Sequence, residues 1–422
     1  MKPPPAGRTA GITRRRLFRY SAATAASVIS SSLPPRGVAR AERGAGTTQG
    51  SQAQPARLSL PPPSGSHPVA TTSLHLVDVT RTDPWVPGVR ELMIQLWYPT
   101  LKTEGGAAAY MPEGAARHFA VSLSQLLFET VTADTVLALR TRARAGADIA
   151  RPRGGLPVVL FSPGEGLDRS SATAIVTDLA SHGFAVVGID HTHDSAEVEF
   201  PDGRVEVGMV HGGDPAAITE ALRVRAADTR FVVDQLAGIN TDGPLRGAFD
   251  LSRIGMLGHS LGGATAAQAM LEDPRISAGV NMDGTILGSV AGAGLDQPFL
   301  LVGSLVHDPG QAVLPGKSDA SWHQFWVNLR GWRQEIVLSD GGHLSFTDIG
   351  LFGGPGGPLD ASAYFPSPTL FLGTFGSIDP PRAALIDRVY LRAFFGRFLR
   401  GQDGRLLDGP SPAFPEILFE QP

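Results

Sequence analysis

A serine lies between closely spaced glycines in the segment Gly-His-Ser-Leu-Gly at residues 258–262. This G-x-S-x-G pattern is typical of a nucleophilic serine held on a sharp turn between a strand and a helix. The chain contains 51 glycines, so the five residues alone are only moderate support for such a role. The flanking sequence strengthens it, because residues 253–257 have the apolar character of a buried strand and residues 264–271 the pattern of a helix. We therefore predict that Ser260 is a nucleophile, against the alternative of a glycine-rich turn without chemistry.

A histidine further along the chain is the predicted general base. A serine hydroxyl is a weak nucleophile near neutral pH, so it needs a base within hydrogen-bonding reach and an acid that orients the base. Three histidines follow the serine, His307, His323 and His343. His343 lies in a glycine-rich segment after a predicted strand at 334–339, whereas His323 lies in a predicted amphipathic helix and is assigned to packing or the surface. We predict that His343 is the base; the alternative is a histidine that only caps its loop.

The acid that orients this histidine has two candidates. Asp283 follows a predicted strand at 278–282, and Asp308 follows the next predicted strand at 299–303. Both would lie at the carboxyl end of a parallel sheet, where the ligands and catalytic groups of such sheets gather. The spacing alone leaves the choice between them open.

The elements that must position these residues alternate between strands and helices. Apolar runs of strand length occur at 74–79, 91–98, 156–162, 184–189, 253–257, 278–282, 299–303 and 334–339. Helical patterns occur at 170–182, 215–237, 264–271, 321–329 and 383–399. From the third run onward the strands are mostly continuously apolar, as expected for parallel strands covered on both faces. The alternation predicts an α/β fold with a mostly parallel, doubly wound, eight-stranded sheet and helices on both faces.

Two stretches interrupt this alternation. Residues 102–152 are predicted to form a mainly helical insertion, and residues 191–214 a loop able to cover the site. The loop contains His191, His193 and Asp194, but a His-x-His pair without further ligands at a supporting spacing is weak support for a metal. We predict neither a metal nor a cofactor. We expect the hydrophobic core to contain Trp322, Trp326 and Trp332, which recur at helical spacing.

The first 41 residues resemble an export signal of the twin-arginine type. Thr-Arg-Arg-Arg-Leu-Phe-Arg at 13–19 precedes a weakly apolar stretch at 21–29 and an Ala-Arg-Ala cleavage site at 39–41. The apolar stretch is too short and too polar to span a bilayer. We predict recognition by twin-arginine export machinery and a periplasmic or secreted mature protein; the alternative is a disordered basic tail.

Composition excludes several classes of function. Residues 1–41 hold eight basic and no acidic side chains, so their removal takes the formal net charge from −4 to about −12. Such a charge disfavours binding to nucleic acid or to an anionic membrane, and no apolar run approaches the length of a membrane span. The chain has no cysteine, which excludes disulfides and thiolate metal sites.

One catalytic domain accounts for most of the remaining chain. Residues 42–68 are rich in Gly, Ser, Gln and Pro and are predicted to be a flexible linker. Residues 69–405 are predicted to form the catalytic domain, and residues 406–422 a C-terminal tail. A domain of this length is acceptable for an α/β enzyme with insertions.

Seven segments of the chain carry a resemblance to a known family. In chain order they are "RELMIQLWYP", "PVVLFSPGEG", "DLASHGFAVVGIDH", "GHSLGGATAAQ", "AGVNMDG", "GGHLSFTD" and "YLRAFFGRFLRG". Through them the chain, from about residue 90 to residue 402, resembles the platelet-activating factor acetylhydrolase family of α/β hydrolases. The resemblance implies an α/β-hydrolase fold and an esterase activity. It also assigns the acid to Asp283 in preference to Asp308.

The oxyanion of the tetrahedral intermediate needs backbone amides aimed at it. One is predicted at Leu261, directly after the serine, and the other in the segment Pro-Gly-Glu-Gly at 163–166. The resemblance assigns the second donor to Glu165, although relatives often carry His-Gly and then an apolar residue here. Because the main chain donates, this departure does not remove the donor, and we expect the carboxylate to face outward. The alternative for this loop is an ordinary turn that ends a strand.

The predicted function is an exported serine ester hydrolase that forms an acyl-enzyme. The resemblance implies short acyl chains on phospholipid-like or other small esters. The alternatives are a lipase or polyester hydrolase, an acyltransferase that uses the same residues with another acceptor, and a hydrolase fold kept for binding. The last alternative predicts a broken triad, whereas here every role has a candidate in the expected order.

Overall fold

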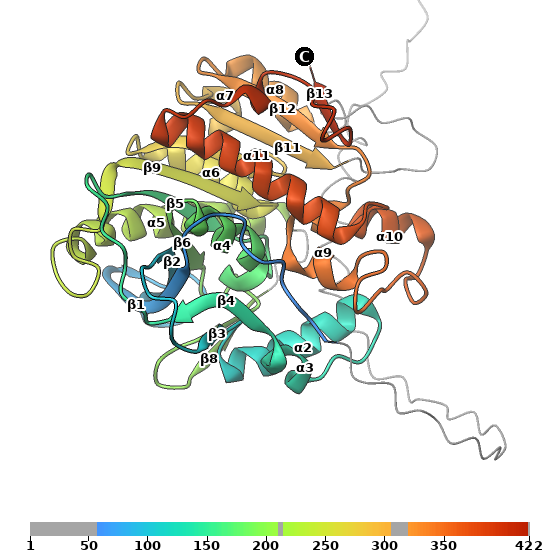
Figure 1. Ribbon diagram of the computed structural model, residues 1–422, viewed down its shortest axis with the longest axis horizontal. Helices are drawn as coiled ribbons and strands as arrows, with labels where there is room; N and C mark the ends of the chain where they lie inside the picture. Colours follow the sequence, from blue (N-terminus) through green and yellow to red (C-terminus); the bar gives the residue numbers. More distant parts are fainter. Residues whose placement is uncertain (1–56, 210–213, 305–319, 421–422) are drawn as a thin grey trace, which may run out of the picture.

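The fold is organised around one large sheet. The computed structural model describes residues 57–209, 214–304 and 320–420 (Figure 1). Eleven strands pair in the order β13-β12-β11-β10-β9-β5-β6-β2-β1-β4-β3. The six strands from β6 to β12 run parallel, whereas the β1–β2, β2–β6, β12–β13 and β3–β4 pairs are antiparallel. The strands are β1 (Val69–Thr82), β2 (Val89–Pro99), β3 (Ala107–Ala109), β4 (Arg140–Ala145), β5 (Leu156–Ser162), β6 (Ala185–Asp190), β9 (Phe249–His259), β10 (Ile276–Met282), β11 (Phe299–Ser304), β12 (Arg333–Leu338) and β13 (Ile417–Glu420).

The eight predicted strands are all present, and the mostly parallel sheet is confirmed. The three further strands, β3, β4 and β13, lie at or near the two edges of the sheet. β3 has three residues and β13 four, and β4 alternates arginine with small residues. Such short or charged segments lack the apolar run by which a buried strand is recognised, so the sequence did not predict them.

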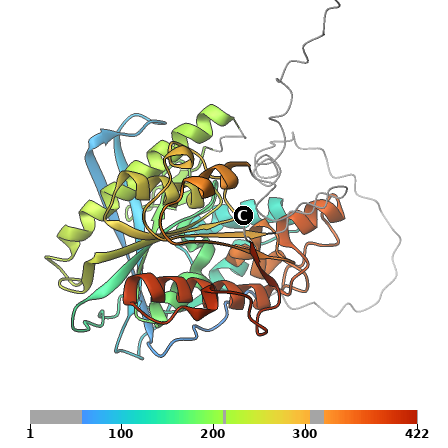
Figure 2. The same cartoon turned by 90° about the horizontal axis from the view of Figure 1, so that it is seen from above.

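Helices cover both faces of the sheet. α4 (Thr173–Ser181) and α11 (Pro380–Arg400) pack on one face, and α5 (Pro215–Ile239), α6 (Leu261–Glu272), α7 (Val290–Ala293) and α8 (Ala320–Asn328) on the other. Figure 2 shows α5 and α11 on opposite sides of the strands. Trp322 and Trp326 are buried in the core between the sheet and α5 to α8, and Trp332 packs against the core on the α4 and α11 face, as predicted. His323 is exposed on α8, which agrees with its assignment to packing or the surface.

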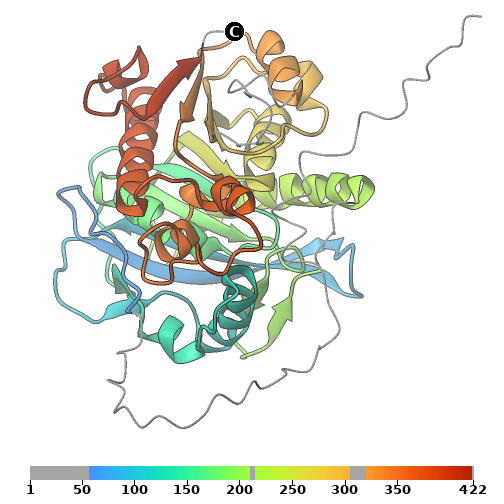
Figure 3. The same ribbon diagram turned by 90° about the vertical axis from the view of Figure 1, so that its right-hand side faces the viewer.

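A third apolar cluster lies at the carboxyl ends of the strands. It contains residues of α2 (Glu113–Leu127), α3 (Ala133–Ala138), α9 (Asp348–Gly353) and α10 (Pro368–Phe375). Figure 3 shows α2, α9 and α10 in front of the sheet. Leu167, which follows β5, and Leu344, which follows β12, belong to the same cluster. The insertion at 102–152 therefore packs beside the edge where the site was predicted. It is less helical than predicted, because it also supplies β3 and β4.

The predicted loop at 191–214 is more structured than expected where it is described. It contains a small two-stranded sheet of β7 (Glu197–Glu199) and β8 (Val205–Val207). His191, Asp194 and Ser195 at its start are buried. Polar side chains occupy these buried positions because each finds a polar partner, which a pattern of hydrophobicity does not reveal.

Two predicted boundaries differ from the structure. The predicted flexible linker ends at residue 68, but Leu58 and Leu60 are buried in the third apolar cluster, so the linker prediction is wrong for residues 57–68. The predicted tail includes β13, which pairs with β12. Two leucines, and a four-residue strand, are too little apolar sequence to stand out by themselves. The predicted export signal at 1–41 lies outside the described residues. In the part of the chain that is described, no helix is long and apolar enough to cross a membrane.

Candidate active site

Ser260 lies on a strained turn at the junction of β9 and α6. Its backbone has φ 54° and ψ −123°, a conformation that is rare for a residue with a side chain. Gly262 permits the close packing of this turn, since a Cβ there would lie 2.0 Å from the carbonyl oxygen of Ser162. The Ser260 amide donates to the carbonyl of Met282 at 2.8 Å, which ties the turn to the end of β10. The strand, turn and helix have the arrangement expected for a nucleophilic serine.

His343 and Asp283 come together although sixty residues separate them in the chain. His343 Nδ1 donates to Asp283 Oδ2 at 2.7 Å. Ser304, at the end of β11, donates to the same carboxylate from its amide at 2.7 Å and its hydroxyl at 2.9 Å. Burial acts to raise the pKa of Asp283, but the hydrogen bonds from His343 and Ser304 outweigh it, so the pKa lies below its usual value. The carboxylate therefore stays charged and holds the imidazole in one tautomer. Asp308, the other candidate acid, lies outside the described residues.

His259 is a site residue that the sequence reasoning missed. Its ring centroid lies 4.6 Å from that of His343, and its Nε2 donates to the His343 carbonyl at 2.8 Å. Burial, followed by the nearby charge of His343, lowers the pKa of His259 to about 3. The ring is thus neutral near pH 7 and supports the backbone of His343. The sequence signal that could have identified His259 is its position directly before Ser260.

The loop after β5 lies against the serine, as the predicted oxyanion site requires. A Cβ on Gly164 would lie 3.4 Å from the Ser260 Cβ. Glu165, which carries the second predicted donor, follows Gly164 and has a half-buried side chain. Leu261 is the first residue of α6, so its amide has no acceptor within the helix. The two predicted donors thus belong to the loop after β5 and to the first turn of α6.

The histidines at 191 and 193 are held by protein groups. His191 lies between Ser162 Oγ at 2.9 Å and Asp228 at 3.0 Å. His193 lies between Asp83 at 3.0 Å and Glu206 at 3.3 Å. Both ring nitrogens of each histidine are therefore engaged with side chains. Within the described ranges no group of His, Asp and Glu side chains could hold a metal ion.

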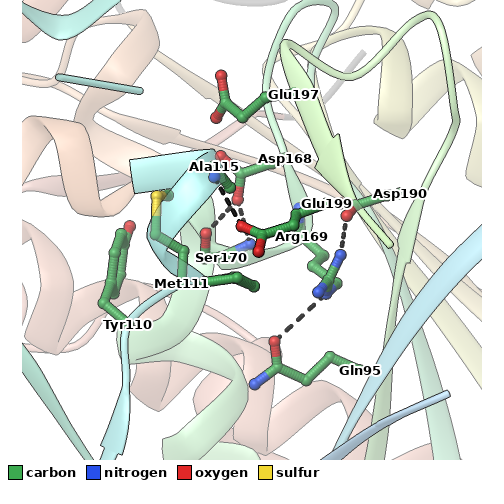
Figure 4. Close-up of a pocket in the computed structure, with 11 residues that line it drawn as sticks. Gln95, Tyr110, Met111, Ala115, Asp168, Arg169, Ser170, Asp190, Glu197 and Glu199 are labelled. Carbon is green, nitrogen blue, oxygen red and sulfur yellow. Dashed lines mark hydrogen bonds and ion pairs between the residues drawn. The ribbon is translucent and has the colours of Figure 1, made fainter. Parts of the chain in front are cut away.

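A small polar cavity lies just past the loop, next to residues 168–170 (Figure 4). Its volume of about 10 Å³ holds about one water molecule, so it cannot accept an ester. Figure 4 shows Arg169 between Asp190 and Gln95, and Glu199 accepting from the Ala115 amide of α2 at 2.9 Å. The first contacts tie the segment after the loop to β6 and β2, and the last one ties the insertion to β7.

Comparisons with known proteins show which family the chain belongs to. The family model "Platelet-activating factor acetylhydrolase, isoform II" matches residues 54–202 and 232–309, more than half of the chain. A protein of Arthroderma benhamiae named "Probable 1-alkyl-2-acetylglycerophosphocholine esterase" is 30% identical over 389 residues, which cover 86% of this chain and 94% of that one. The platelet-activating factor acetylhydrolase of Bos taurus is 25% identical over 277 residues, covering 58% of this chain and 60% of the bovine one.

A solved structure extends the comparison to three dimensions. The ferulic acid esterase from Streptomyces cinnamoneus superposes with a TM-score of 0.72 and is 36% identical. The match covers 87% of this chain and all of that one. It confirms the α/β-hydrolase fold predicted from the sequence. By its sequence, its fold and its matched length, the chain is an esterase that belongs to the platelet-activating factor acetylhydrolase family.

Proposed function

We propose that this protein hydrolyses short acyl esters through an acyl-enzyme formed on Ser260, with His343 as the general base and Asp283 as the acid that orients it. The observation that carries the proposal is the 2.7 Å hydrogen bond between His343 and Asp283, at the same end of the sheet as the strained serine. A serine, a carboxylate and a histidine in this order along the chain form the constellation known for acyl transfer in such a sheet.

The proposed reaction has two steps. Because His343 Nδ1 donates to Asp283, the other ring nitrogen, Nε2, is the one available to take a proton. Ser260 attacks the ester carbonyl as His343 takes its proton, and the histidine returns that proton to the leaving alcohol. A water molecule then attacks the acyl-enzyme by the same route and releases the acid. The negative charge of each tetrahedral intermediate would be accepted by the amides of Leu261 and Glu165.

The proposed substrates are small esters with short acyl groups, of the phospholipid-like kind named for the fungal and bovine relatives. Packing of the insertion against the strand ends supports a confined site rather than the open apolar groove that a lipase or polyester hydrolase needs. A second candidate, an aromatic acyl ester, is supported by the ferulic acid esterase, which is more similar in sequence at 36% identity. An acyltransferase would use the same residues and differ only in the acceptor.

The reaction is tested with p-nitrophenyl esters of two to sixteen carbons, using the wild type and Ser260→Ala. We expect activity to fall with chain length and to drop about 10⁴-fold or more in the variant, because nothing replaces the nucleophile. A preference for long chains would favour a lipase. Equal rates for the wild type and the variant on all esters would refute the hydrolase.

The acyl group is tested with two natural types of ester. Comparison of kcat/KM for a 1-alkyl-2-acetylglycerophosphocholine and for methyl ferulate separates the two candidates. We expect the acetyl ester to be preferred, and a preference for the ferulate would assign the aromatic substrate instead. Adding an alcohol and measuring transfer against hydrolysis tests the acyltransferase.

Export is a separate proposal, supported by the segment at 13–41 that resembles a twin-arginine signal. Replacing Arg14, Arg15 and Arg16 by lysine keeps the positive charge and removes the arginines. We expect the wild-type chain to be exported in a host with this machinery and the lysine variant to stay in the cytoplasm. Equal export of both would refute the twin-arginine route.

A further inference from the structure

We propose that Arg225 of α5 is a positioning residue that fixes the direction of the Glu165 amide at the oxyanion site. The proposal rests on the proposed function, because it concerns the second oxyanion donor of that reaction. It assigns a role to a buried cation that the triad does not use, and to Asp194 in the segment at 190–195, for which the sequence analysis found only weak support as a metal ligand.

Arg225 holds the loop after β5 directly. Its guanidinium is fully buried and donates to the carbonyl of Pro163 at 2.5 Å and to that of Gly164 at 3.1 Å. A fork of this kind holds two acceptors in fixed relative positions, which a single ammonium does not. The two carbonyls directly precede Glu165, so the guanidinium clamps the part of the chain that leads to the proposed donor.

The geometry of the peptide unit turns this clamp into a direction for the amide. The Gly164 carbonyl and the Glu165 N–H belong to one peptide, and the described residues contain no cis peptide bond. In a trans peptide the carbonyl and the N–H point in opposite directions. Because the Gly164 carbonyl faces Arg225, the Glu165 N–H faces away from it. The same glycine lies against Ser260, so the direction set by Arg225 is fixed beside the nucleophile.

The segment at 190–195 holds Arg225 in place. Asp194 binds the guanidinium through both carboxylate oxygens, at 2.5 and 2.7 Å, and both side chains are fully buried. The Asp194 carbonyl also accepts from the amide of Gly166, on the other side of Glu165. The loop is thus held before and after the proposed donor.

A second layer of charges supports this arrangement. His191 accepts from Ser162 Oγ, the last residue of β5, and donates to Asp228. Asp228 binds Arg90 through both oxygens, and Arg90 also donates to the carbonyl of Thr192. Burial acts to raise the pKa of Asp228, but the charge of Arg90 and the hydrogen bond from His191 outweigh it and leave the pKa far below its usual value. Buried ion pairs often add no stability over apolar packing. We therefore assign this network a role in positioning the loop carbonyls rather than in stabilising the fold.

The test measures oxyanion stabilisation separately from folding. Phenyl acetate is compared with its thionoester, in which sulfur replaces the carbonyl oxygen and accepts hydrogen bonds weakly. An enzyme that relies on aimed amides prefers the oxygen ester, and a misdirected amide reduces that preference. A merely structural defect lowers both rates equally and leaves their ratio unchanged.

Three variants in the network and one matched control complete the experiment. Arg225→Met removes the fork, Arg225→Lys keeps the charge but not the two-carbonyl clamp, and Asp194→Asn keeps the shape but removes the charge that holds the guanidinium. Arg223→Met is the control, because this arginine lies on the same helix but is 64% exposed and pairs with Glu220. Thermal unfolding of each variant reports whether it is folded.

We expect Arg225→Met to lower kcat on the oxygen ester about 10- to 100-fold, with KM changed less than about threefold and the oxygen-to-sulfur ratio reduced by a similar factor. Arg225→Lys and Asp194→Asn should lower the ratio less, and Arg223→Met should match the wild type. If Arg225→Met does not fold, the lysine and asparagine variants decide. Folded variants with the wild-type ratio would overturn the proposal, whereas a wild type no faster than Ser260→Ala would overturn the proposed function itself.

Discussion

The two sides of Ser260 are built in different ways. On one side, His343 at the start of η2 (His343–Phe346) and Asp283 after β10 keep 22% and 10% of their side-chain surface exposed. On the other side, the loop at 163–166 is fixed by Arg225 and Asp194, both fully buried. A few hydrogen bonds hold His343 and Asp283. A network of hydrogen bonds and ion pairs that extends to Arg90 supports the loop.

The difference follows from what each side has to do. A base that exchanges protons with substrate, leaving group and water has to be within their reach. An oxyanion donor has to be fixed before the reaction, because its contribution depends on not having to reorganise. We infer that the enzyme leaves the groups that transfer protons partly exposed and buries the charges that keep the oxyanion donor pointing in one direction.

The largest effect should come from the acid on the exposed side. Asp283→Asn removes the charge that fixes the His343 tautomer, and we expect kcat to fall about 10⁴-fold with the fold retained. Asp308→Asn is the matched control and should stay within about threefold of the wild type. Activity measurements with circular dichroism of both variants check this. A large loss in Asp308→Asn and a small one in Asp283→Asn would exchange their roles and break the comparison.

An intermediate effect should come from His259, which joins the two sides. His259→Leu removes the hydrogen bond to the His343 carbonyl, and we expect kcat to fall about tenfold and unfolding to become easier by about 1 kcal/mol. His259→Gln keeps an N–H donor and should recover most of the activity. Equal activity of the leucine variant and the wild type would show that this hydrogen bond does not position the base.

The same residue makes a prediction about acid stability. The pKa of His259 is lowered to about 3 in the folded protein, so below pH 6.5 the unfolded chain binds a proton here that the folded one does not. Its contribution to stability is present above pH 6.5 and is lost as the pH falls towards 3. Denaturant unfolding of His259→Gln should therefore show a weaker loss over this range than that of the wild type.

The smallest effect on activity should come from the sheet edge behind His343. Burial, followed by the neighbouring Glu420 of β13, raises the pKa of Glu335 on β12 to about 7. The folded protein thus keeps a proton here that the unfolded chain loses near pH 4.5, and stability falls as the pH rises from 4.5 to 7. Glu335→Gln should avoid this loss and gain about 1 to 2 kcal/mol at pH 8, with unchanged activity.

Unfolding midpoints at pH 4, 6 and 8 check the last prediction. Glu420→Gln should give part of the same gain, because it removes the neighbouring charge. A Glu335→Gln variant no more stable than the wild type at pH 8 would show that the Glu335 carboxyl group does not destabilise the folded protein at this pH. The pH-dependent loss of stability at this edge of the sheet would then be refuted.

Local sequence patterns predicted most of the strands and helices of the sheet and the position of the nucleophilic serine candidate. Eight strands, five helices and the turn around Ser260 follow from apolar periodicity and glycine spacing, which act over a few residues. Seven ordered segments indicated the family, and the comparisons confirmed it. His343 was found because it follows a strand, where a parallel sheet collects its functional groups.

What the local patterns did not reveal depends on contacts between distant parts of the chain. Arg90 and Asp228 are 138 residues apart, and neither has a local signal that predicts the other as its partner. The acid was chosen through the family resemblance, and only the packing of β10, β11 and η2 (His343–Phe346) places Asp283 against His343. Local residue patterns alone specify which elements form and which serine they present. The tertiary structure decided which charges meet behind the site, because burial makes a charge depend on partners that only the fold can bring to it.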